Sequence, residues 1–335
     1  MPRLSIVVPF LGNLDLLEDT LVSVLENRPE ACQIVVVLNE GYDDPYGLHG
    51  EVAFVASRPD AGLLGGIYRG LLACDAPIVH VLACGMSVTS GWAEVALPHF
   101  DNPQVGAVAP LVLSSARPDR VVSAGLAYDR EGRIRCLSAG RPATRPALKH
   151  RPCGPDARAA FYRRSALGAL TDWHEGQGPA MVGIDLALGL RQQGCDCVVE
   201  PDCRTFAPPC LNAPVGAFRT GLEEARLFWR WASRHGWSSS VASHAALLVN
   251  ECFSGLVWPP RAIRAAGRLA GGLEAALPGK RARRGVSTSA VPEPHFSRSA
   301  APRQLVTATA ARGALASNRS EICSSGPAAP RRAPG

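Results

Sequence analysis

Long apolar runs are missing from this sequence. Its most membrane-like stretch, from Val241 to Trp258, is interrupted by polar and charged side chains, among them His244 and Glu251. A membrane-spanning helix needs about 20 predominantly apolar residues, so this stretch predicts a buried or interfacial helix and no transmembrane segment. The N-terminus also has no apolar segment of the signal-peptide kind, and we therefore expect a cytoplasmic protein.

Charged residues are sparse, at 19% of the chain, and the net charge of +6 is unevenly distributed. From Gly279 to the C-terminus, ten Lys or Arg residues accompany two Glu, which gives +8 and leaves −2 for the first 278 residues. The basic charge therefore belongs to a tail, and the rest of the chain has no electrostatic support for nucleic-acid binding. The tail is rich in Pro, Ser, Ala and Arg without periodicity, which predicts disorder.

The eleven cysteines do not form a zinc motif of known spacing. Cys195, Cys197, Cys203 and Cys210 lie close together in the sequence, so a metal site and a group of buried thiols are both open interpretations. Their irregular spacing favours buried thiols, because cysteine is commonly found in protein cores. Without a signal-peptide pattern, this many cysteines also indicates a reducing compartment and no disulfide framework.

Short apolar runs rich in β-branched residues are frequent, and the first two frame the rest of the chain. Residues 4–10 and 33–39 have this pattern, and residues 14–25 between them carry apolar side chains at helical spacing. The pattern predicts a βαβ unit with parallel strands, whose carboxyl ends meet at the edge where open α/β sheets bind ligands. Candidate binding residues at these ends are Pro9, Phe10, Asn39, Gly41 and Asp43.

The remaining patterns continue an α/β arrangement. Further strands are predicted at 51–56, 76–83, 105–110, 158–164 and 197–201, and further helices at 63–73, 91–100, 185–193 and 217–234. Residues 114–155 alternate short apolar pieces with Arg, Gly and Pro, which predicts an irregular or hairpin-bearing insertion. We expect an α/β domain over 1–212, a helical extension over 213–278 and a disordered tail over 279–335.

Glycines are concentrated at the start of the helix predicted at 63–73. Gly62, Gly65, Gly66 and Gly70 each cost a helix roughly 1 kcal/mol relative to alanine, so a bare backbone must serve a purpose there. One interpretation is close approach of a ligand to the helix N-terminus. The other is tight packing of the helix on the sheet, and both stay open at this point.

Several segments, taken in order, resemble the family 2 glycosyltransferases, which have the GT-A fold. The matching segments are Ser5 to Asn13 (SIVVPFLGN), Val36 to Asp43 (VVLNEGYD), Asp60 to Gly70, Gly91-Trp92, Val105 to Val108, Ala160 to Leu167 and Asp185 to Gly194. The resemblance implies a mostly parallel sheet flanked by helices. It also implies transfer of a sugar from a nucleotide sugar to a saccharide or lipid-linked acceptor, in cell-surface polysaccharide synthesis.

The resemblance further implies a nucleotide site. Asn39 stands where the family has an acidic residue that grips the nucleotide, and Asp43 keeps the second acidic position. Gly62 and Gly70 match the glycines of the next family segment. Backbone amides near Gly62 and Gly85 are expected to hold the diphosphate, with Arg163 or Arg164 supplying positive charge.

Both charge-handling motifs of the family are absent. The position of its metal-binding Asp-x-Asp reads Ala83-Cys84-Gly85, so no ligands for Mg²⁺ or Mn²⁺ are found and metal-independent chemistry is expected. The position of its catalytic Glu-Asp pair reads Val182-Gly183.

A substitute general base is sought among His174, Glu175 and Asp185. Asp185 also fits the role of a helix cap, and both interpretations stay open. Two hypotheses follow, because the scaffold is kept while the motifs are lost. One is a working metal-independent glycosyltransferase, and the other is an inactive homologue that serves as a binding or scaffold protein.

The helices after residue 217 allow peripheral contact with the inner face of the membrane. Arg261, Arg264 and Arg268 share one helical face, which suits anionic lipid. The alternative is a solvated face that contacts only water.

Overall fold

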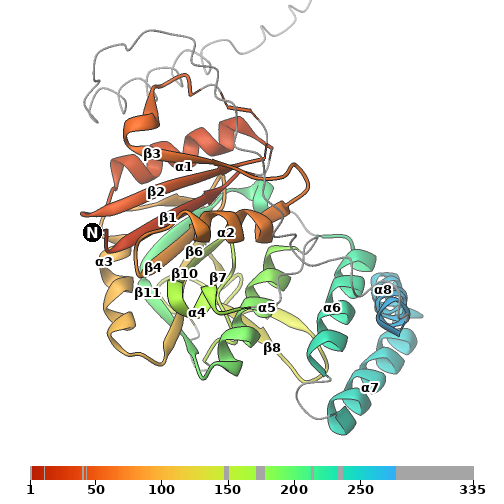
Figure 1. Ribbon diagram of the computed structural model, residues 1–335. Helices are drawn as coiled ribbons and strands as arrows, with labels where there is room; N and C mark the ends of the chain where they lie inside the picture. The colour runs from red at the N-terminus through yellow and green to blue at the C-terminus, as the bar shows by residue number, and fades with distance from the viewer. Residues whose placement is uncertain are drawn as a thin grey trace, which may run out of the picture.

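The computed structural model describes residues 2–10, 12–39, 41–42, 44–146, 151–170, 178–212, 215–232 and 237–276. Of the candidate site residues, Asp43, His174 and Glu175 lie outside these ranges, as does the tail predicted to be disordered. The described chain is a mostly parallel sheet covered by helices, with three further helices at one side (Figure 1). The predicted α/β class is therefore confirmed.

One large sheet runs through the molecule. Its strands are β1 (Leu4–Pro9), β2 (Cys32–Leu38), β3 (Val52–Ala56), β4 (Ile78–Leu82), β5 (Ser87–Val88), β6 (Val105–Ser114), β7 (Val121–Ser123), β10 (Ala159–Arg163) and β11 (Asp196–Ala207). The order across the sheet is β3-β2-β1-β4-β10-β6-β11-β5, and β7 pairs with β6. Strands β3, β2, β1 and β4 are parallel neighbours, whereas β10 is antiparallel to both β4 and β6. A small hairpin of β8 (Leu126–Tyr128) and β9 (Ile134–Cys136) lies in the predicted insertion.

Helices cover both faces of the sheet. The helical elements are α1 (Leu14–Glu26), η1 (Leu48–Gly50), α2 (Gly62–Leu72), α3 (Trp92–Ala96), η2 (Leu97–Asp101), α4 (Arg164–Gly168), α5 (Pro179–Gln192), η3 (Pro209–Asn212), α6 (Ala217–Ala232), α7 (Trp237–Gly255) and α8 (Pro259–Ala276). Helices α1 and α3 pack in one core cluster, and α2, α4 and α5 pack in another. Alternate residues of β1 enter different clusters: Ile6 belongs to the first and Val7 to the second. The strand is thus buried on both faces, as its continuous apolar run indicates.

The βαβ unit at the N-terminus forms as predicted. Asn13 caps α1, because its side-chain oxygen accepts a hydrogen bond from the backbone N–H of Leu16 at 3.1 Å. The chain then returns through β2, which pairs in parallel with β1 from Leu4 opposite Cys32 to Pro9 opposite Val37. The carboxyl ends of β1 and β2 consequently lie side by side.

Helices α6, α7 and α8 form an extension that packs on α5 and on the β8–β9 hairpin (Figure 1). Its interior holds a cluster of ion pairs: Arg268 and Arg264 both bind Glu224, and Arg268 also binds Glu251. The side chains of Arg268 and Glu224 are 0% and 1% exposed. The interpretation of Arg264 and Arg268 as a lipid-facing or solvated basic face is therefore wrong, because buried carboxylates bind both. None of the helices in the described part of the chain has the length and apolar content needed to cross a bilayer.

Candidate functional site

The carboxyl ends of three parallel strands meet at one edge of the sheet. In the register, Pro9 of β1 lies opposite Val37 of β2, and Val7 lies opposite Val81 of β4. The residues that follow these strands, Phe10, Asn39 and Ala83, are thereby brought to the same edge. The sequence predicts a site at this edge.

Two polar side-chain atoms at this edge are buried without a hydrogen bond to a described residue. Neither the side-chain oxygen of Asn39 nor the hydroxyl of Tyr42 has a partner among the described residues. An unsatisfied buried polar group destabilises a fold, so such groups call for an explanation, for example a ligand. Tyr42 lies against Phe54, with ring centroids 5.3 Å apart. Burial raises the pKa of Tyr42, and the nearby acids Asp44 and Glu18 raise it further, so its hydroxyl stays protonated and able to donate.

Tyr42 was not singled out by the sequence pattern. The signal was present, since Tyr42 is the one aromatic residue in the segment Asn39 to Asp44. An aromatic ring with a polar end can pack on a ligand and hydrogen-bond to it.

The other candidates in this segment and in β1 have different surroundings. Phe10 is 3% exposed and belongs to the core, and its N–H donates to the carbonyl of Val37 at 2.8 Å. The carbonyl of Pro9 accepts a hydrogen bond from the thiol of Cys84 at 3.1 Å. Both residues are therefore buried at the end of β1, where their backbone groups bond to neighbouring segments. Gly41 is exposed, and no atom lies within 4 Å of the position of a Cβ there.

The position that corresponds to the family's metal motif is part of the hydrophobic core. Ala83, Cys84 and Met86 are 1%, 3% and 0% exposed. No group of three or more His, Cys, Asp or Glu side chains in the described ranges is arranged to hold a metal ion. The residues present do not fit a divalent cation, which prefers oxygen ligands. The crowded cysteines offer no alternative site either, because no three of them in the described part of the chain are arranged around a common point.

Gly85 was expected to offer its amide to a diphosphate, and this is wrong. Its N–H already donates to the carbonyl of Leu16 at 2.9 Å and to the hydroxyl of Thr20 at 2.8 Å. Its φ of +89° explains why glycine is needed. A Cβ at this position would lie 3.3 Å from both Leu211 and Pro208, so the segment after β11 covers the turn.

The glycines of α2 divide between the two interpretations. A Cβ on Gly70 would lie 2.3 Å from Cγ1 of Val7, and a Cβ on Gly66 would lie 2.8 Å from Cβ of Pro9. These glycines let the helix pack closely on β1, so the expectation of Gly70 as a ligand contact is wrong. Gly62 is different. It begins α2 with a φ of +59° and has no atom within 4 Å of a Cβ position, so it stays a candidate for ligand contact at a helix N-terminus.

Arg163 and Arg164 lie at the opposite edge of the sheet. Strand β10 is antiparallel to β4, so Arg163 pairs with Ile78, the first residue of β4. The guanidinium of Arg163 donates to the carbonyls of Val105, Phe100 and Asn102. That of Arg164 donates to the carbonyl of Cys74. The prediction that they hold a diphosphate is therefore wrong.

A different arginine lies at the carboxyl edge. The carbonyl of Arg158 accepts a hydrogen bond from the N–H of Ala83 at 2.8 Å, which places this residue beside the absent metal motif. Its guanidinium binds Asp156 at 2.6 Å and also donates to Asn212 at 3.1 Å. Burial alone would lower the pKa of Arg158, but Asp156 raises it by more, so the side chain stays a cation. Its position depends on the antiparallel direction of β10, which the sequence did not reveal.

Asp185 is not a helix cap, and its carboxylate is bound by two side chains of α6. Helix α5 begins at Pro179, six residues earlier than predicted, so Asp185 lies inside the helix and is 6% exposed. Its carboxylate accepts hydrogen bonds from Trp231, at 2.7 Å, and from Arg230 of α6. The residue thus ties α5 to the helical extension. The interpretation of Asp185 as a helix cap is wrong, and its role as a catalyst stays a prediction.

The position of the expected catalytic carboxylate leaves no room for a side chain. A Cβ on Gly183 would lie 2.3 Å from the carbonyl oxygen of Pro155 and 3.2 Å from the N–H nitrogen of Ala157. Contacts with backbone cannot be relieved by turning a side chain. The loop before β10 therefore occupies the space in which a carboxylate at residue 183 would stand.

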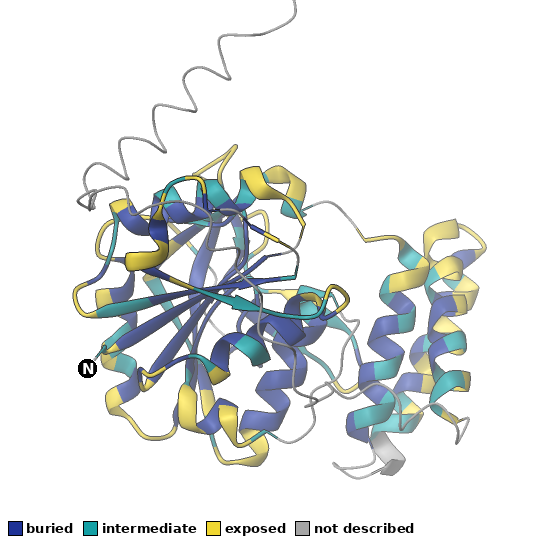
Figure 2. Cartoon of the chain, turned by 45° about the horizontal axis from the view of Figure 1, so that its top comes forward, coloured by how far each residue is buried: buried dark blue, intermediate teal, exposed yellow. Residues whose placement is uncertain are grey.

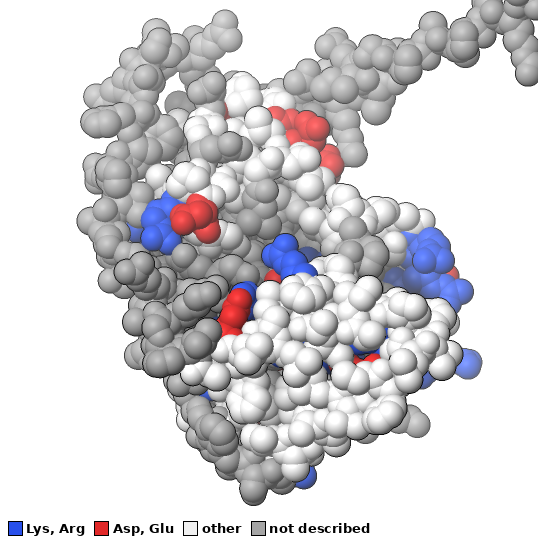
Figure 3. All heavy atoms as spheres, turned by 90° about the vertical axis from the view of Figure 1, so that its right-hand side faces the viewer, with Lys and Arg blue, Asp and Glu red and all other residues white. Residues whose placement is uncertain are grey.

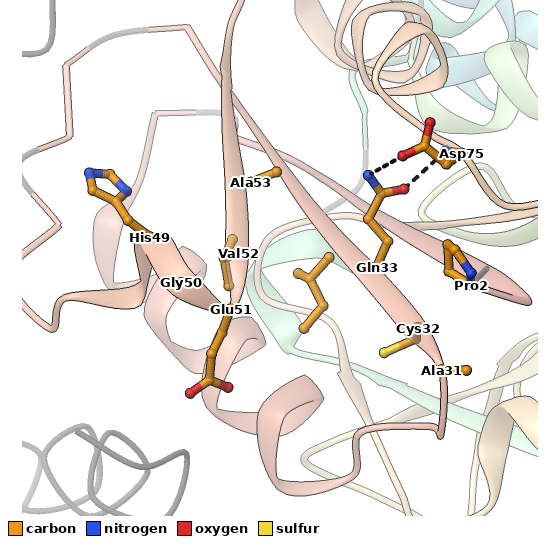
Figure 4. A pocket seen from close by; sticks show the side chains of 11 residues that line it. Pro2, Ala31, Cys32, Gln33, His49, Gly50, Glu51, Val52, Ala53 and Asp75 are labelled. Atoms are coloured by element: carbon orange, nitrogen blue, oxygen red, sulfur yellow. Dashed lines mark hydrogen bonds between the residues drawn. The ribbon is translucent and has the colours of Figure 1, made fainter. Parts of the chain in front are cut away.

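An open depression of about 590 Å³ lies at the other edge, around the start of β2 and β3 (Figure 4). The polar groups of Gln33 and Asp75 inside it bind each other, since the Asp75 N–H donates to the Gln33 side chain at 3.0 Å. Glu51 at its rim pairs with Arg28 at 3.1 Å. These groups are already satisfied, and we assign no site to this depression.

The sequence matches no family model and no curated protein. Solved structures do resemble the fold, at low identity. GalNAc-T7, solved with UDP, GalNAc and Mn²⁺, aligns with a TM-score of 0.57 and 14% identity over 79% of this chain and 54% of its own, so the chain spans about half of its length. The mannosyltransferase PcManGT from Pyrobaculum calidifontis, solved with GDP-Man and Mn²⁺, aligns with a TM-score of 0.51 and 15% identity. The alignment covers 82% of this chain and 87% of PcManGT. S. aureus TarS 1-349 aligns with a TM-score of 0.53 and 12% identity, over 82% of this chain and 80% of the TarS chain. These similarities show that the chain has the GT-A fold.

Proposed function

We propose that this protein is a glycosyltransferase that moves a sugar from a nucleotide sugar to a saccharide or lipid-linked acceptor in cell-surface polysaccharide synthesis. The observation that carries the proposal is the pair of unpartnered polar groups, Asn39 and Tyr42, at the carboxyl edge of a GT-A sheet. Open α/β sheets bind ligands at this edge. Two of the similar structures were solved with a nucleotide or nucleotide sugar, UDP and GDP-Man, which supports the ligand class.

In this proposal, Asn39, Tyr42 and Asp43 bind the base and ribose of the donor. Gly62 and the N-terminus of α2 face the phosphates, because the first backbone N–H groups of a helix favour an anion. Arg158 supplies the fixed positive charge that stabilises the leaving diphosphate. A cation held in place before reaction needs little rearrangement as the negative charge develops.

The acceptor hydroxyl needs a base, and the carboxylate of Asp185 is paired with Arg230. His174 and Glu175 lie outside the described residues and stay candidates for this role. Metal-independent chemistry likewise stays part of the proposal, because Ala83-Cys84-Gly85 provides no oxygen ligand from a side chain. A protein that uses lipid-linked acceptors would work at the inner face of the membrane.

A second candidate is favoured by the packing at Gly183 and Cys84. Backbone atoms fill the space of the family's base, and core residues replace its metal ligands. These changes suit an inactive homologue that keeps a nucleotide site for binding or scaffolding.

Calorimetric titration of the full chain with UDP, GDP, dTDP and their sugar conjugates, with and without Mn²⁺, tests the donor site. Micromolar binding of one nucleotide without metal supports the proposal. Release of nucleotide from the conjugate in the presence of saccharide acceptors, measured on the same preparation, then separates the enzyme from the inactive homologue. A cooperatively melting protein that binds none of these compounds would overturn the proposal.

A further inference from the structure

The insertion between β6 and β10 is a basic segment in an otherwise acidic part of the chain. Residues 114–146, all of which the structure describes, contain seven Arg and three acidic residues, which gives +4. Since the first 278 residues carry −2 in total, the remainder of them carries −6. Figure 3 views the side on which the helical extension lies and shows a broad area that is mostly uncharged. Positive charge that is concentrated on one segment attracts an anionic partner to it.

The acidic side chains of the insertion lie mostly at one end of its hairpin. Asp129 and Glu131 are in the turn between β8 and β9, where both pair with Arg133. At the opposite end of the hairpin, two further turns meet, and Arg120 pairs there with Pro142 as an isolated antiparallel bridge. The charges of the insertion are therefore separated along its length.

Four arginines surround this bridge. The N–H of Arg120 donates to the carbonyl of Arg117 at 2.9 Å, and the carbonyl of Arg141 accepts a hydrogen bond from the residue after Arg120, also at 2.9 Å. Arg145 follows in the next turn, where its N–H donates to the carbonyl of Pro142 at 3.1 Å. The residues Arg117, Arg120, Arg141 and Arg145 are all exposed, and together they are called the basic edge surface.

Three of these guanidinium groups are unpaired. That of Arg120 binds Asp119 at 3.1 Å. Those of Arg117, Arg141 and Arg145 have neither an ion pair nor a hydrogen bond with a described residue. Cations that lie close together with one acid among them repel one another, and an anion that binds between them relieves this repulsion.

The basic edge surface lies at the same edge of the sheet as the donor site. Strand β10 is antiparallel to both β4 and β6, so β4 and β6 end at the same edge. The strand order places β6 three positions from β1, a separation of roughly 14 Å. Figure 2 shows the strands of the sheet as mainly buried, with exposed residues on loops and on the outer sides of helices.

The basic edge surface also projects beyond this edge. The register places Leu82, the last residue of β4, level with Pro110 of β6. Strand β6 continues to Ser114, and these four further residues extend roughly 13 Å past the end of β4. A single sugar unit is much smaller than this separation, so a molecule that contacts both places must be a chain of several units.

The surroundings of the four arginines favour a saccharide over other polyanions. No large apolar side chain in residues 114–146 is exposed, whereas proteins that lie on lipid surfaces bury apolar side chains there. Tyr128 is the one aromatic residue of the segment, and it lies next to the other end of the hairpin. The surface therefore has no aromatic ring on which a nucleic-acid base would stack.

We propose that the acceptor is an anionic saccharide polymer and that the basic edge surface binds its acidic groups. The inference rests on the proposed function, because only a transferase has an acceptor. Each guanidinium pairs with a carboxylate or phosphate of the polymer, several units away from the end that receives the sugar.

Calorimetric titration of the full chain compares polygalacturonate, a polymer of a carboxylated sugar, with dextran, a neutral one. We expect binding of polygalacturonate alone, and this binding should weaken as salt is raised. The triple variant R117Q/R141Q/R145Q should bind polygalacturonate about tenfold more weakly, since an exposed ion pair contributes at most roughly a fivefold factor. The matched control R3Q/R130Q/R261Q removes the same charge from exposed arginines elsewhere and should bind as the wild type does.

The basic tail also attracts polyanions, so a second measurement reports on individual arginines. Modification of the full chain by p-hydroxyphenylglyoxal, followed by peptide mass spectrometry, gives the reaction rate of each exposed arginine. Polygalacturonate should slow the modification of Arg117, Arg141 and Arg145 and leave that of Arg261, on α8, unchanged. Dextran should protect none of them.

Three results would overturn the inference. The wild type could bind dextran as well as polygalacturonate, or the two triple variants could lose affinity equally. Alternatively, phosphatidylglycerol vesicles or duplex DNA could protect the three arginines better than polygalacturonate does at equal charge concentration, which would assign the surface to lipid or nucleic acid.

Nucleotide titration of the same preparations separates this inference from the proposed function. R117Q/R141Q/R145Q should bind the donor nucleotide as the wild type does, because the substituted residues lie three strands away from β1. A wild type that binds polygalacturonate but no nucleotide would overturn the proposed function. Nucleotide binding without polygalacturonate binding would overturn only this inference.

Discussion

The centre of the sheet contains an imidazole with no hydrogen bond. His80, in the middle of β4, is 0% exposed, and neither ring nitrogen has a partner in the described part of the chain. Its ring lies 3.9 Å from that of Phe161 and 4.6 Å from that of Trp92. Burial lowers the pKa of His80 from 6.5 to about 3, so the residue is neutral in the folded protein.

Replacing His80 with Leu should stabilise the fold and change its pH dependence. Removing an unsatisfied buried polar group should add roughly 1 kcal/mol to the free energy of unfolding at pH 7. The folded pKa lies below the unfolded one, so the wild type loses stability as pH falls from 6.5 towards 3, by about 2 kcal/mol at pH 5. Urea unfolding at both pH values should show this loss in the wild type and in His49→Leu, a surface control, but not in His80→Leu. An equal loss in all three proteins would contradict the assignment.

Tyr42→Phe should weaken nucleotide binding without lowering the stability of the fold. If the unpartnered hydroxyl binds the donor, its removal should weaken nucleotide binding about tenfold while leaving the free energy of unfolding equal or slightly higher. The control is Tyr46→Phe, because the Tyr46 hydroxyl bonds to Glu18 at 3.2 Å. Titration calorimetry and urea unfolding measure the two effects. Unchanged nucleotide affinity in Tyr42→Phe would remove Tyr42 from the site.

Asp185→Asn tests the structural role assigned to this residue. The substitution removes the ion pair with Arg230 inside a largely buried contact, so the free energy of unfolding should fall by roughly 2 kcal/mol. Combining it with Arg230→Gln should cost less than the sum of the single changes, because both remove the same pair. Nucleotide affinity should be unchanged, and a weakened affinity in the folded variant would return Asp185 to the site.

Among the elements, α6 and α8 make the closest contact in the extension. A Cβ on Gly221 would lie 2.1 Å from the carbonyl oxygen of Arg264, and one on Gly267 would lie 2.1 Å from that of Phe218. The backbones of the two helices therefore meet directly, with glycine on each side. This contact also positions Arg264 and Arg268 to reach Glu224.

Gly267→Ala should consequently destabilise the protein although alanine favours helix. The intrinsic gain of about 1 kcal/mol is outweighed by the clash with the Phe218 backbone, and we expect a net loss of roughly 1–3 kcal/mol in urea unfolding. The control is Gly168→Ala in α4, where no atom lies within 4 Å of the added Cβ. Equal stability of the two variants would show that the helices are not in direct contact.

For the whole molecule, the described hydrophobic clusters all lie before residue 233. Deleting residues 279–335 changes the formal charge from +6 to −2 and removes no residue of these clusters. We therefore expect the deleted protein to unfold cooperatively at the urea midpoint of the full chain, within error. A lower midpoint would show that the tail contributes to the fold.

Elements were more predictable than contacts. The βαβ unit, the strands and the hairpin-bearing insertion follow from apolar periodicity, and the structure contains them. Helix α5 begins six residues before the predicted start, because Pro179 is a residue that favours the first turn of a helix. That error placed Asp185 at a helix end, where a cap or a base was the natural interpretation.

The sequence by itself determined the α/β class and the loss of carboxylates at residues 83–85 and 182–183, because both depend on which residues stand at which positions. Only the tertiary structure decided which groups meet. Strand direction moves Arg163 to the far edge and Arg158 to the near one, since an antiparallel strand presents its first residue where a parallel strand presents its last. Nothing in a local pattern reports that direction, nor does it report contacts between distant segments, such as the hydrogen bonds from the Gly85 N–H to Leu16 and Thr20 of α1.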